Sequence, residues 1–450
     1  MNDTIAAIST ALGVGAISII RVSGDDSINI VNKIFKGKDL TKVKSHTINY
    51  GYIIDNREII DEVLVSVMKS PKTFTKEDIV EINCHGGVAT TNRVLELLLT
   101  NGARLAEPGE FTKRAFLNGR IDLINAEGVM DLINAKTEKN RQISINKLNG
   151  KASNLVKELR EKLIKIISNI EVNIDYPEYE DIEVLTNEKI LPEIITFKND
   201  LEKIIKDSED GKIINEGINV GIIGKPNVGK SSLLNALLEE EKAIVTDIEG
   251  TTRDIVEGKI NLGGLILNII DTAGIRETDN LVEKIGVEKS MEIIDKVDLI
   301  IFVLNNNEDI TEEELKILNK IKDKNSIVVI NKIDLEKKIK LTNYNKKIIE
   351  ISVKDNIGIE ELKNEIKRIY NIEGIDTKDM TYLSNARSIS LLKQSLLKIS
   401  TSIKNIEENA PIDIVELDLK NAWELLGKII GETYSDELLD ELFSRFCLGK

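Results

Sequence analysis

One octapeptide constrains this chain more than any other feature, because it fits the pattern G-x-x-x-x-G-K-[S/T]. It reads Gly-Lys-Pro-Asn-Val-Gly-Lys-Ser and occupies residues 224–231. An apolar run, 218–223, precedes it, and a helix-like run, 232–238, follows it. A strand, a glycine-rich loop and a helix in this order surround phosphate oxygens with backbone N–H groups at a helix N-terminus. The sequence therefore predicts a site for a nucleoside triphosphate.

Individual residues of this loop have expected roles. Lys230 is expected to reach the β- and γ-phosphates, and the Ser231 hydroxyl to bind Mg²⁺, which takes few protein ligands. The amide oxygen of Asn227 has two interpretations: it binds a monovalent cation such as potassium beside the phosphates, or it hydrogen-bonds the loop backbone. The loop residues expected to contact the nucleotide are Asn227, Val228, Gly229, Lys230, Ser231 and Ser232.

Two later motifs indicate which base is bound. Asn-Lys-Ile-Asp at 331–334 follows an apolar run at 327–330. The carboxylate of Asp334 can accept hydrogen bonds from the N1–H and the exocyclic amine of guanine, a pair of donors that adenine lacks. Ser-Val-Lys at 352–354 supplies a backbone contact to the guanine oxygen. The nucleotide is therefore predicted to be GTP. Its expected contacts in these motifs are Asn331, Lys332, Asp334, Ser352 and Lys354.

Two further segments are expected to meet the γ-phosphate and Mg²⁺. Asp-Thr-Ala-Gly at 271–274 follows the apolar run 265–270. Its acid can therefore meet Mg²⁺ through water, and its glycine N–H can contact the γ-phosphate. Gly-Thr-Thr-Arg-Asp at 250–254 offers threonine hydroxyls, one of which should complete the Mg²⁺ shell. The GTP contacts expected here are Thr251, Thr252, Asp271, Thr272, Ala273 and Gly274.

The group that orients the attacking water differs from the usual one. Many GTPases carry a glutamine directly after Asp-x-x-Gly, whereas this chain has Ile275. The charged residues downstream are candidates, and each of them also fits a solvated charged helix. They are Arg276, Glu277, Glu283 and Glu288.

Composition argues against several other classes of protein. A formal net charge of -15 disfavours broad electrostatic binding of nucleic acid, although a local basic patch or a partner protein can supply it. Two cysteines and two histidines are too few for a disulfide framework or a zinc site. No apolar stretch approaches the roughly 18 residues of a membrane span, and the N-terminus lacks the basic start of a signal peptide. We therefore expect a cytoplasmic protein.

The composition and apolar spacing of the sequence change along the chain and indicate a multidomain protein with α/β and all-α parts. Residues 1–118 mix short β-like runs with glycine turns, as in a small α/β domain. Residues 119–212 are helical, strands and helices alternate in 213–375, and 376–450 are helical again. The simplest arrangement inserts the nucleotide domain into a helical domain built from both flanks.

Several elements are predicted individually. In the first domain, strands are expected at 16–22, 63–68 and 79–82, and a helix at 89–101. The second is expected to be interrupted only at Pro177 and Pro192, with one apolar face formed by Leu155, Leu159, Leu163, Ile166, Ile167 and Ile170. The last is expected to contain helices at 384–407 and 420–442.

Four segments outside the GTP motifs resemble a known family. They are Asp-Thr-Ile-Ala-Ala-Ile-Ser-Thr at 3–10, Gly86-Gly87 after His85, Gly-Glu-Phe-Thr-Lys-Arg-Ala-Phe at 109–116, and Phe-Cys-Leu-Gly-Lys at 446–450. Together they make the chain similar to the MnmE family of tRNA modification GTPases, also called TrmE. The resemblance implies an N-terminal tetrahydrofolate-binding and dimerisation domain, a helical domain, and an inserted Ras-like G domain.

The resemblance also implies an activity and partners. Members of the family act with the FAD-containing protein MnmG, in a heterotetramer, to add an aminomethyl or carboxymethylaminomethyl group to C5 of the wobble uridine of certain tRNAs. The one-carbon donor is 5-formyl- or 5,10-methylene-tetrahydrofolate, and ammonium and glycine both stay open as the amine. The G domains dimerise when GTP and potassium are bound.

Residue roles carry over by motif. Potassium would be held by Asn227, Thr246, Ile248 and Thr251, and Mg²⁺ by Ser231 and Thr252. Thr246 also joins the expected GTP contacts. Glu283, in Val-Glu-Lys-Ile-Gly at 282–286, matches the catalytic glutamate that orients water in the family.

The resemblance also implies a folate site, made by Arg21, Glu81, Arg120 and the C-terminal Lys450. Arg120 stands where the family usually has lysine, which keeps the charge but changes the geometry. Cys447 has two interpretations: a small buried apolar residue, or a residue of the modification site whose chemical role is open.

A second function from another class is a ribosome-assembly GTPase acting as an RNA-binding switch, since such proteins share the Gly-x-Pro-Asn-x-Gly-Lys-Ser loop. They usually carry a separate RNA-binding module, and no GXXG loop in a KH-like setting is evident here. The resemblance along the whole chain favours the tRNA modification GTPase.

Overall fold

The computed structural model describes residues 3–175, 187–240, 256–270, 291–341, 346–370 and 383–450. The chain divides into two compact units, each assembled from separate stretches of sequence. Unit 1 comprises Met1–Met130, Lys147–Phe197 and Gln394–Lys450, and unit 2 comprises Asp131–Asn146 and Lys198–Lys393. The division into domains at 1–118, 119–212, 213–375 and 376–450 remains a prediction.

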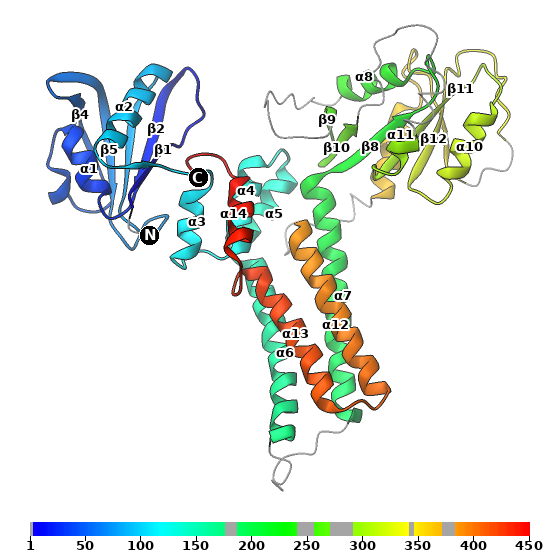
Figure 1. Cartoon of the computed structure of the whole chain (residues 1–450). Coiled ribbons are helices and arrows are strands. Elements are labelled where there is room, and N and C mark those ends of the chain that lie inside the picture. The colour runs from blue at the N-terminus through cyan, green and yellow to red at the C-terminus, as the bar shows by residue number, and fades with distance from the viewer. Residues whose placement is uncertain (1–2, 176–186, 241–255, 271–290, 342–345, 371–382) are drawn as a thin grey trace. The chain divides into compact units, whose positions relative to one another are not determined.

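Unit 1 contains a seven-stranded sheet with strand order β3-β4-β5-β6-β2-β1-β7 (Figure 1). The strands are β1 (Ile5–Ile8), β2 (Gly15–Ser23), β3 (Phe35–Lys36), β4 (Thr47–Asp55), β5 (Glu58–Met68), β6 (Ile79–Gly86) and β7 (Arg104–Leu105), with a short 3₁₀ helix at Leu40–Lys42. Helices α1 (Ser27–Ile34) and α2 (Val88–Thr100) cover one face. Val31 and Val94 of these helices share a buried core with Val65 and Ile82 of the sheet. The strands and the helix predicted in this region are confirmed.

The opposite face of this sheet carries polar and apolar side chains together. Along one row, Ile48 lies opposite Ser66, Ser66 opposite Glu81, and Glu81 opposite Arg21. Side chains alternate between the two faces of a strand, so this row lies on the face that does not contain the buried Val65.

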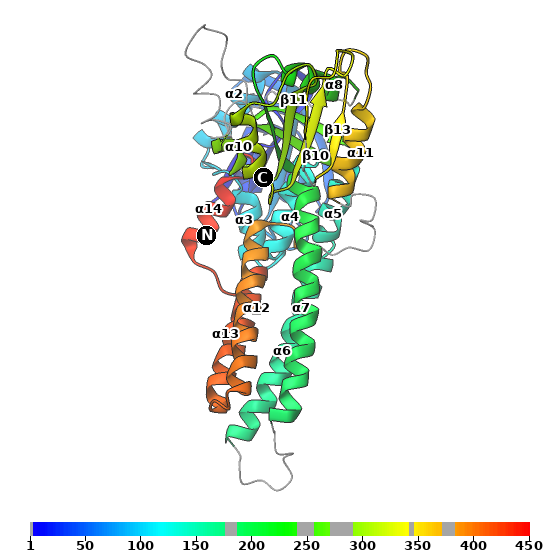
Figure 2. The same ribbon diagram turned by 90° about the vertical axis from the view of Figure 1, so that its right-hand side faces the viewer.

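The remaining part of unit 1 is helical. Figure 1 and Figure 2 show α6 (Lys151–Asp175) and α13 (Ile412–Ile430) side by side. Of the apolar residues predicted on one face of α6, Leu155 is half-buried, and the following are buried: Leu159, Leu163, Ile166, Ile167 and Ile170. The other helices of the helical regions, some of which lie partly or mostly in unit 2, are α3 (Glu110–Leu117), α4 (Leu123–Asn134), α5 (Glu138–Leu148), α7 (Asn187–Glu216), α12 (Ala386–Glu407) and α14 (Asp436–Ser444). Within the described ranges no helix is long and apolar enough to cross a bilayer.

Two element predictions in the helical part were wrong. The helix expected at 420–442 is two helices, because α13 ends where Gly431 adopts a left-handed φ of 82° and Ser435 caps the start of α14. Pro192 does not interrupt α7 but lies inside it, where the Thr196 hydroxyl donates to its carbonyl oxygen at 2.8 Å. Pro177 lies outside the described residues.

Unit 2 is built on a six-stranded sheet with strand order β13-β12-β11-β8-β10-β9, parallel except for β9. The strands are β8 (Ile218–Ile223), β9 (Val256–Leu262), β10 (Leu265–Ile270), β11 (Leu299–Asn305), β12 (Ser326–Asn331) and β13 (Ile348–Glu350). Among the described helices, α8 (Lys230–Glu240), α10 (Glu312–Lys320) and α11 (Ile359–Ile369) pack against this sheet, and unit 2 also contains most of α5 and of α7. β8 and β10 match the predicted runs residue for residue. The predicted alternation of strands and helices is therefore confirmed.

Candidate functional site

The loop between β8 and α8 has the backbone of a phosphate cradle. Gly224 has φ 149° and Gly229 has φ 100°, both outside the range that side chains favour. A Cβ at Gly224 would lie 2.4 Å from the Val303 carbonyl oxygen, and one at Gly229 would lie 2.2 Å from Asn331 Nδ2. The two glycines of the motif are therefore required by backbone conformation and by close neighbours at once.

The lysine of the motif lies on this loop. Lys230 Nζ donates to the carbonyl oxygens of Gly224 at 2.9 Å and Lys225 at 2.7 Å. Burial lowers the pKa of its ammonium group. An ammonium has three N–H donors, so one remains for a phosphate oxygen. Ser231 and Ser232 are exposed at the start of α8, where a hydroxyl is accessible to a hydrated Mg²⁺ ion.

The predicted base-reading motifs meet the loop through one amide side chain. Asn331 Nδ2 donates to the Val228 carbonyl oxygen at 2.9 Å, and Asn331 Oδ1 accepts from the Val353 N–H at 3.3 Å. Ser352 Oγ donates to Asp334 Oδ1 at 3.0 Å. Asp334 is otherwise exposed, so a base can reach its carboxylate. Three motifs far apart in the sequence therefore meet at the carboxyl ends of neighbouring strands, the usual position of a ligand in such sheets.

Of the other residues predicted to contact the nucleotide, Lys332 is half-buried and Lys354 is exposed. The rest of the predicted residues of the nucleotide site lie outside the described residues. They are Thr246, Ile248, Thr251, Thr252, Asp271, Thr272, Ala273, Gly274 and Glu283, together with Ile275, Arg276, Glu277 and Glu288. Asn227 is described: it is exposed and has a left-handed φ of 61°.

Sequence reasoning missed one support of the loop. Lys225 Nζ lies 3.0 Å from Oε2 of the buried Glu314 in α10. The same carboxylate oxygen accepts from the N–H and hydroxyl of Thr311, both at 2.9 Å, in a capping box. The Thr-x-x-Glu spacing at 311–314 is the sequence signal that identifies such a box. The phosphate loop is thus tied to the start of α10.

The predicted folate-binding residues come together in unit 1. Arg21 pairs with Glu81 at 2.7 Å on the face of the sheet opposite α1 and α2, here called the open face. The Arg21 guanidinium carbon lies 5.8 Å from the centre of the Phe74 ring and 5.7 Å from that of Phe111. Arg120 lies over the same Phe74 ring at 4.8 Å and donates to the Phe74 carbonyl oxygen at 3.0 Å. The Phe74 ring is therefore within cation–π distance of two cationic side chains, an arrangement that sequence reasoning missed.

The C-terminal tail reaches this cluster. The Ser9 hydroxyl donates to the Gly449 carbonyl oxygen at 3.1 Å, and the Phe111 N–H donates to that of Lys450 at 3.1 Å. Burial, and then repulsion by Arg21, lower the pKa of the Lys450 ammonium, while Glu81 acts in the opposite sense. Lys450 thus lies beside the Arg21–Glu81 pair.

Cys447 is close in sequence to this contact but presents its backbone to it. The Gly109 N–H donates to the Cys447 carbonyl oxygen at 3.4 Å. The residue is exposed, which contradicts its interpretation as a small buried apolar residue. The interpretation as a modification-site residue stays a prediction.

The fold and the phosphate loop of unit 2, with its base-reading motifs, define a P-loop GTPase domain. A family model described as "MnmE helical domain" matches residues 123–447, and one described as "GTP-binding protein TrmE N-terminus" matches residues 4–120. The chain therefore belongs to the MnmE family of tRNA modification GTPases.

Individual relatives agree with this assignment along the whole chain. The proteins named tRNA modification GTPase MnmE from Bacillus cytotoxicus and Bacillus mycoides are each 52% identical to it, covering 100% of this chain and 99% of theirs. Among solved structures, the G domain of the T. maritima FeoB iron transporter is 27% identical over 34% of this chain and 98% of its own, with a TM-score of 0.26. A TM-score this low carries no argument about function.

Proposed function

We propose that this chain hydrolyses GTP in a potassium-dependent way and couples hydrolysis to the modification of tRNA in the cytoplasm. The proposal rests on the hydrogen bonds of the Asn331 side chain, which connect the phosphate loop to the segment that follows Ser352. Ser352 in turn donates to Asp334. The exposed side chain of Asn227, in that loop, has an amide oxygen of the kind that binds a monovalent cation. The other proposed potassium ligands are Thr246, Ile248 and Thr251, and Thr252 joins Ser231 at Mg²⁺.

Glu283 is proposed to orient the attacking water, because Ile275 has no polar group for this task. Replacing Glu283 with alanine should preserve GTP affinity and slow hydrolysis by a factor on the order of 10² to 10⁴, the range typical of a positioned acid–base or water-orienting group. A Glu283→Ala protein that hydrolyses GTP at the normal rate would remove Glu283 from this role.

The modification proposed is the addition of an aminomethyl or carboxymethylaminomethyl group to C5 of the wobble uridine, together with an MnmG-type FAD protein. Membership of the family supports this proposal. The test is mass analysis of wobble nucleosides from cells that lack the protein, with cells that express it as the control. Loss of the modified uridines is expected, and an unchanged nucleoside profile would contradict the proposal.

A tetrahydrofolate is proposed as the one-carbon donor, bound near Arg21, Glu81, Arg120 and Lys450. These four residues carry three positive charges and one negative charge, which suits the carboxylates of a folate tail. The aromatic ring of Phe74, which both arginines contact, offers an apolar surface next to these charges. Calorimetric titration with 5-formyltetrahydrofolate tests the site, and the absence of binding by the intact protein would refute it.

A second copy of this chain is proposed to bind the open face of the unit 1 sheet. Ile48 is 69% exposed on that face, in the row that ends at Arg21, and Tyr50 and Leu64 of the neighbouring row are 57% and 46% exposed. Contiguous exposed apolar side chains usually mark an interface. Sedimentation of a Leu64→Glu variant should give monomers, with Leu397→Glu as a matched change at an exposed leucine of α12. Dimers of Leu64→Glu would argue for another interface. A further contact, between G domains that have bound GTP and potassium, is proposed for the hydrolysis step.

A further inference from the structure

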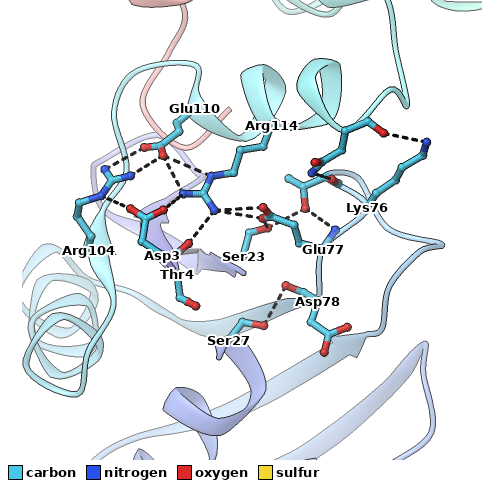
Figure 3. Close-up of polar contacts among 12 residues, drawn as sticks. Asp3, Thr4, Ser23, Ser27, Lys76, Glu77, Asp78, Arg104, Glu110 and Arg114 are labelled. Carbon is cyan, nitrogen blue, oxygen red and sulfur yellow. Dashed lines mark hydrogen bonds and ion pairs between the residues drawn. The ribbon is translucent and has the colours of Figure 1, made fainter. Parts of the chain in front are cut away.

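A cluster of charged side chains, some buried and some exposed, lies beside the proposed folate site in unit 1 (Figure 3). At its centre is Arg114 of α3, whose side chain is only 1% exposed. Its guanidinium lies 2.8 Å from Asp3 Oδ1, 3.2 Å from Glu77 Oε1 and 3.0 Å from Glu110 Oε1. Arg104 pairs with two of the same acids, Asp3 and Glu110, each at 2.6 Å.

Burying a guanidinium is costly unless its N–H groups all have hydrogen-bond acceptors. Arg114 meets this condition with acids from three different segments: Asp3 (two residues before β1), the loop at 70–78, and its own helix. It also donates to the Asp3 carbonyl oxygen at 2.8 Å. The side chain therefore fastens three pieces of backbone to each other, and a lysine with one nitrogen cannot do the same.

Two of these pieces form the proposed folate site. The loop that contains Glu77 also carries Phe74, whose ring both Arg21 and Arg120 contact. The helix that contains Glu110 also carries Phe111, whose N–H holds the carbonyl oxygen of Lys450.

A hydrogen bond from the sheet also holds the Glu77 carboxylate. Ser23 Oγ donates to Glu77 Oε2 at 2.7 Å, at the end of the strand that bears Arg21. Arg114 is thus connected to Arg21 through its contact with Glu77, the contact of Glu77 with Ser23, and strand β2.

We infer that Arg114 is a positioning residue of the folate site: it sets the distance between the loop that bears Phe74 and the helix that holds the C-terminal tail. This inference rests on the proposed binding of folate. It assigns to the buried Arg114 a role beyond stabilising the domain, because its partners determine where ligand-contacting groups lie and not only whether the domain folds.

The test compares the full-length protein with Arg114→Lys and Glu77→Gln. Arg93 of the same unit, which pairs with Asp55 and Glu96 at the surface, provides the matched control Arg93→Lys. Each protein is titrated with 5-formyltetrahydrofolate and with GTP, and amide hydrogen exchange is followed in peptides covering 70–78, 447–450 and, as a reference, β5.

Arg114→Lys and Glu77→Gln should weaken folate binding by roughly tenfold to a hundredfold, the loss typical when a group that orients a ligand-contacting residue is removed. Exchange should rise at 70–78 and 447–450 but not in β5, while GTP affinity and the Arg93→Lys control stay unchanged. Glu77→Gln keeps the test valid if Arg114→Lys does not fold.

Two results would overturn the inference. If both variants bind folate as tightly as the intact protein, Arg114 does not position the site. If exchange rises equally in β5 and folate affinity is kept, its role is to stabilise the domain. An intact protein that binds no folate at all would instead contradict the proposed function on which the inference rests.

Discussion

At the scale of single residues, the aspartate that we propose to read guanine is supported by a neighbouring side chain. Asp334 accepts a hydrogen bond from Ser352 at 3.0 Å, and Asn331 connects the neighbouring segment to the phosphate loop. Such support keeps a specificity group in place without a conformational cost on binding. We therefore expect discrimination between bases to depend on the carboxylate of Asp334.

Changing that carboxylate should change the nucleotide. In Asp334→Asn, the amide cannot accept two hydrogen bonds from guanine, so GTP affinity should fall on the order of a hundredfold or more. Xanthosine triphosphate, whose exocyclic group has the opposite hydrogen-bond sense, should bind better than GTP. Competition titrations with the two nucleotides measure this preference, and unchanged GTP affinity would contradict the role of Asp334.

At the scale of elements, the charge cluster makes the fit of α3 on its neighbours depend on pH. The hydrogen bond from Arg104 lowers the pKa of Asp3 from its usual 3.8. Burial alone would raise the pKa of Glu110, but hydrogen bonds from Arg104, the Glu107 N–H and Arg114 lower it from 4.5. A carboxyl whose pKa is lower in the folded state than in the unfolded state stabilises the fold at pH values above the unfolded-state pKa. This stabilisation is lost as the pH falls through the folded-state pKa.

Removing Arg104 should therefore matter most near neutral pH. In Arg104→Met, the free energy of unfolding should be lower than in the intact protein at about pH 7, and the difference should shrink as pH falls below about 4.5. Denaturant titrations of both proteins across this range give the comparison. A difference that is the same at about pH 7 and about pH 3 would show that the two carboxyls are not responsible.

The C-terminal tail is the second element whose position has a measurable consequence. Gly449 has φ 84°, and a Cβ there would lie 2.3 Å from the Ile8 carbonyl oxygen. We expect Gly449→Ala, like deletion of Lys450, to weaken 5-formyltetrahydrofolate binding while GTP binding is kept. The same titration on a Gly150→Ala variant, at a left-handed glycine with open space around it, is the control for backbone strain alone. Normal folate binding by the two tail variants would exclude the tail from the site.

Local patterns predicted the elements well and the supports of the sites poorly. β8 and β10 follow from their mostly apolar runs, because parallel strands buried on both faces show little alternation. The break at Gly431 was missed, since the apolar spacing continues through 420–442. The partners of Arg114 and the ring of Phe74 lie in separate segments, so no local pattern indicates which residues meet. The residues carried over from the family did come together at Arg21, Glu81 and Lys450.

At the scale of the whole molecule, a single chain carries a GTPase site in unit 2 and a proposed one-carbon site in unit 1. We propose that hydrolysis in unit 2 depends on a potassium ion held in part by Asn227. Potassium would balance negative charge that develops at the phosphates, a task that oriented donors or cations perform in such enzymes.

The most direct measurement is GTP turnover by the intact protein in potassium and in sodium salts at matched ionic strength, repeated with Asn227→Ala. The intact protein should turn over at least about tenfold faster in potassium, a modest share of what one group that stabilises transition-state charge contributes. Asn227→Ala should bind GTP as before and show no preference for potassium. Equal turnover of the intact protein in the two salts would contradict the claim.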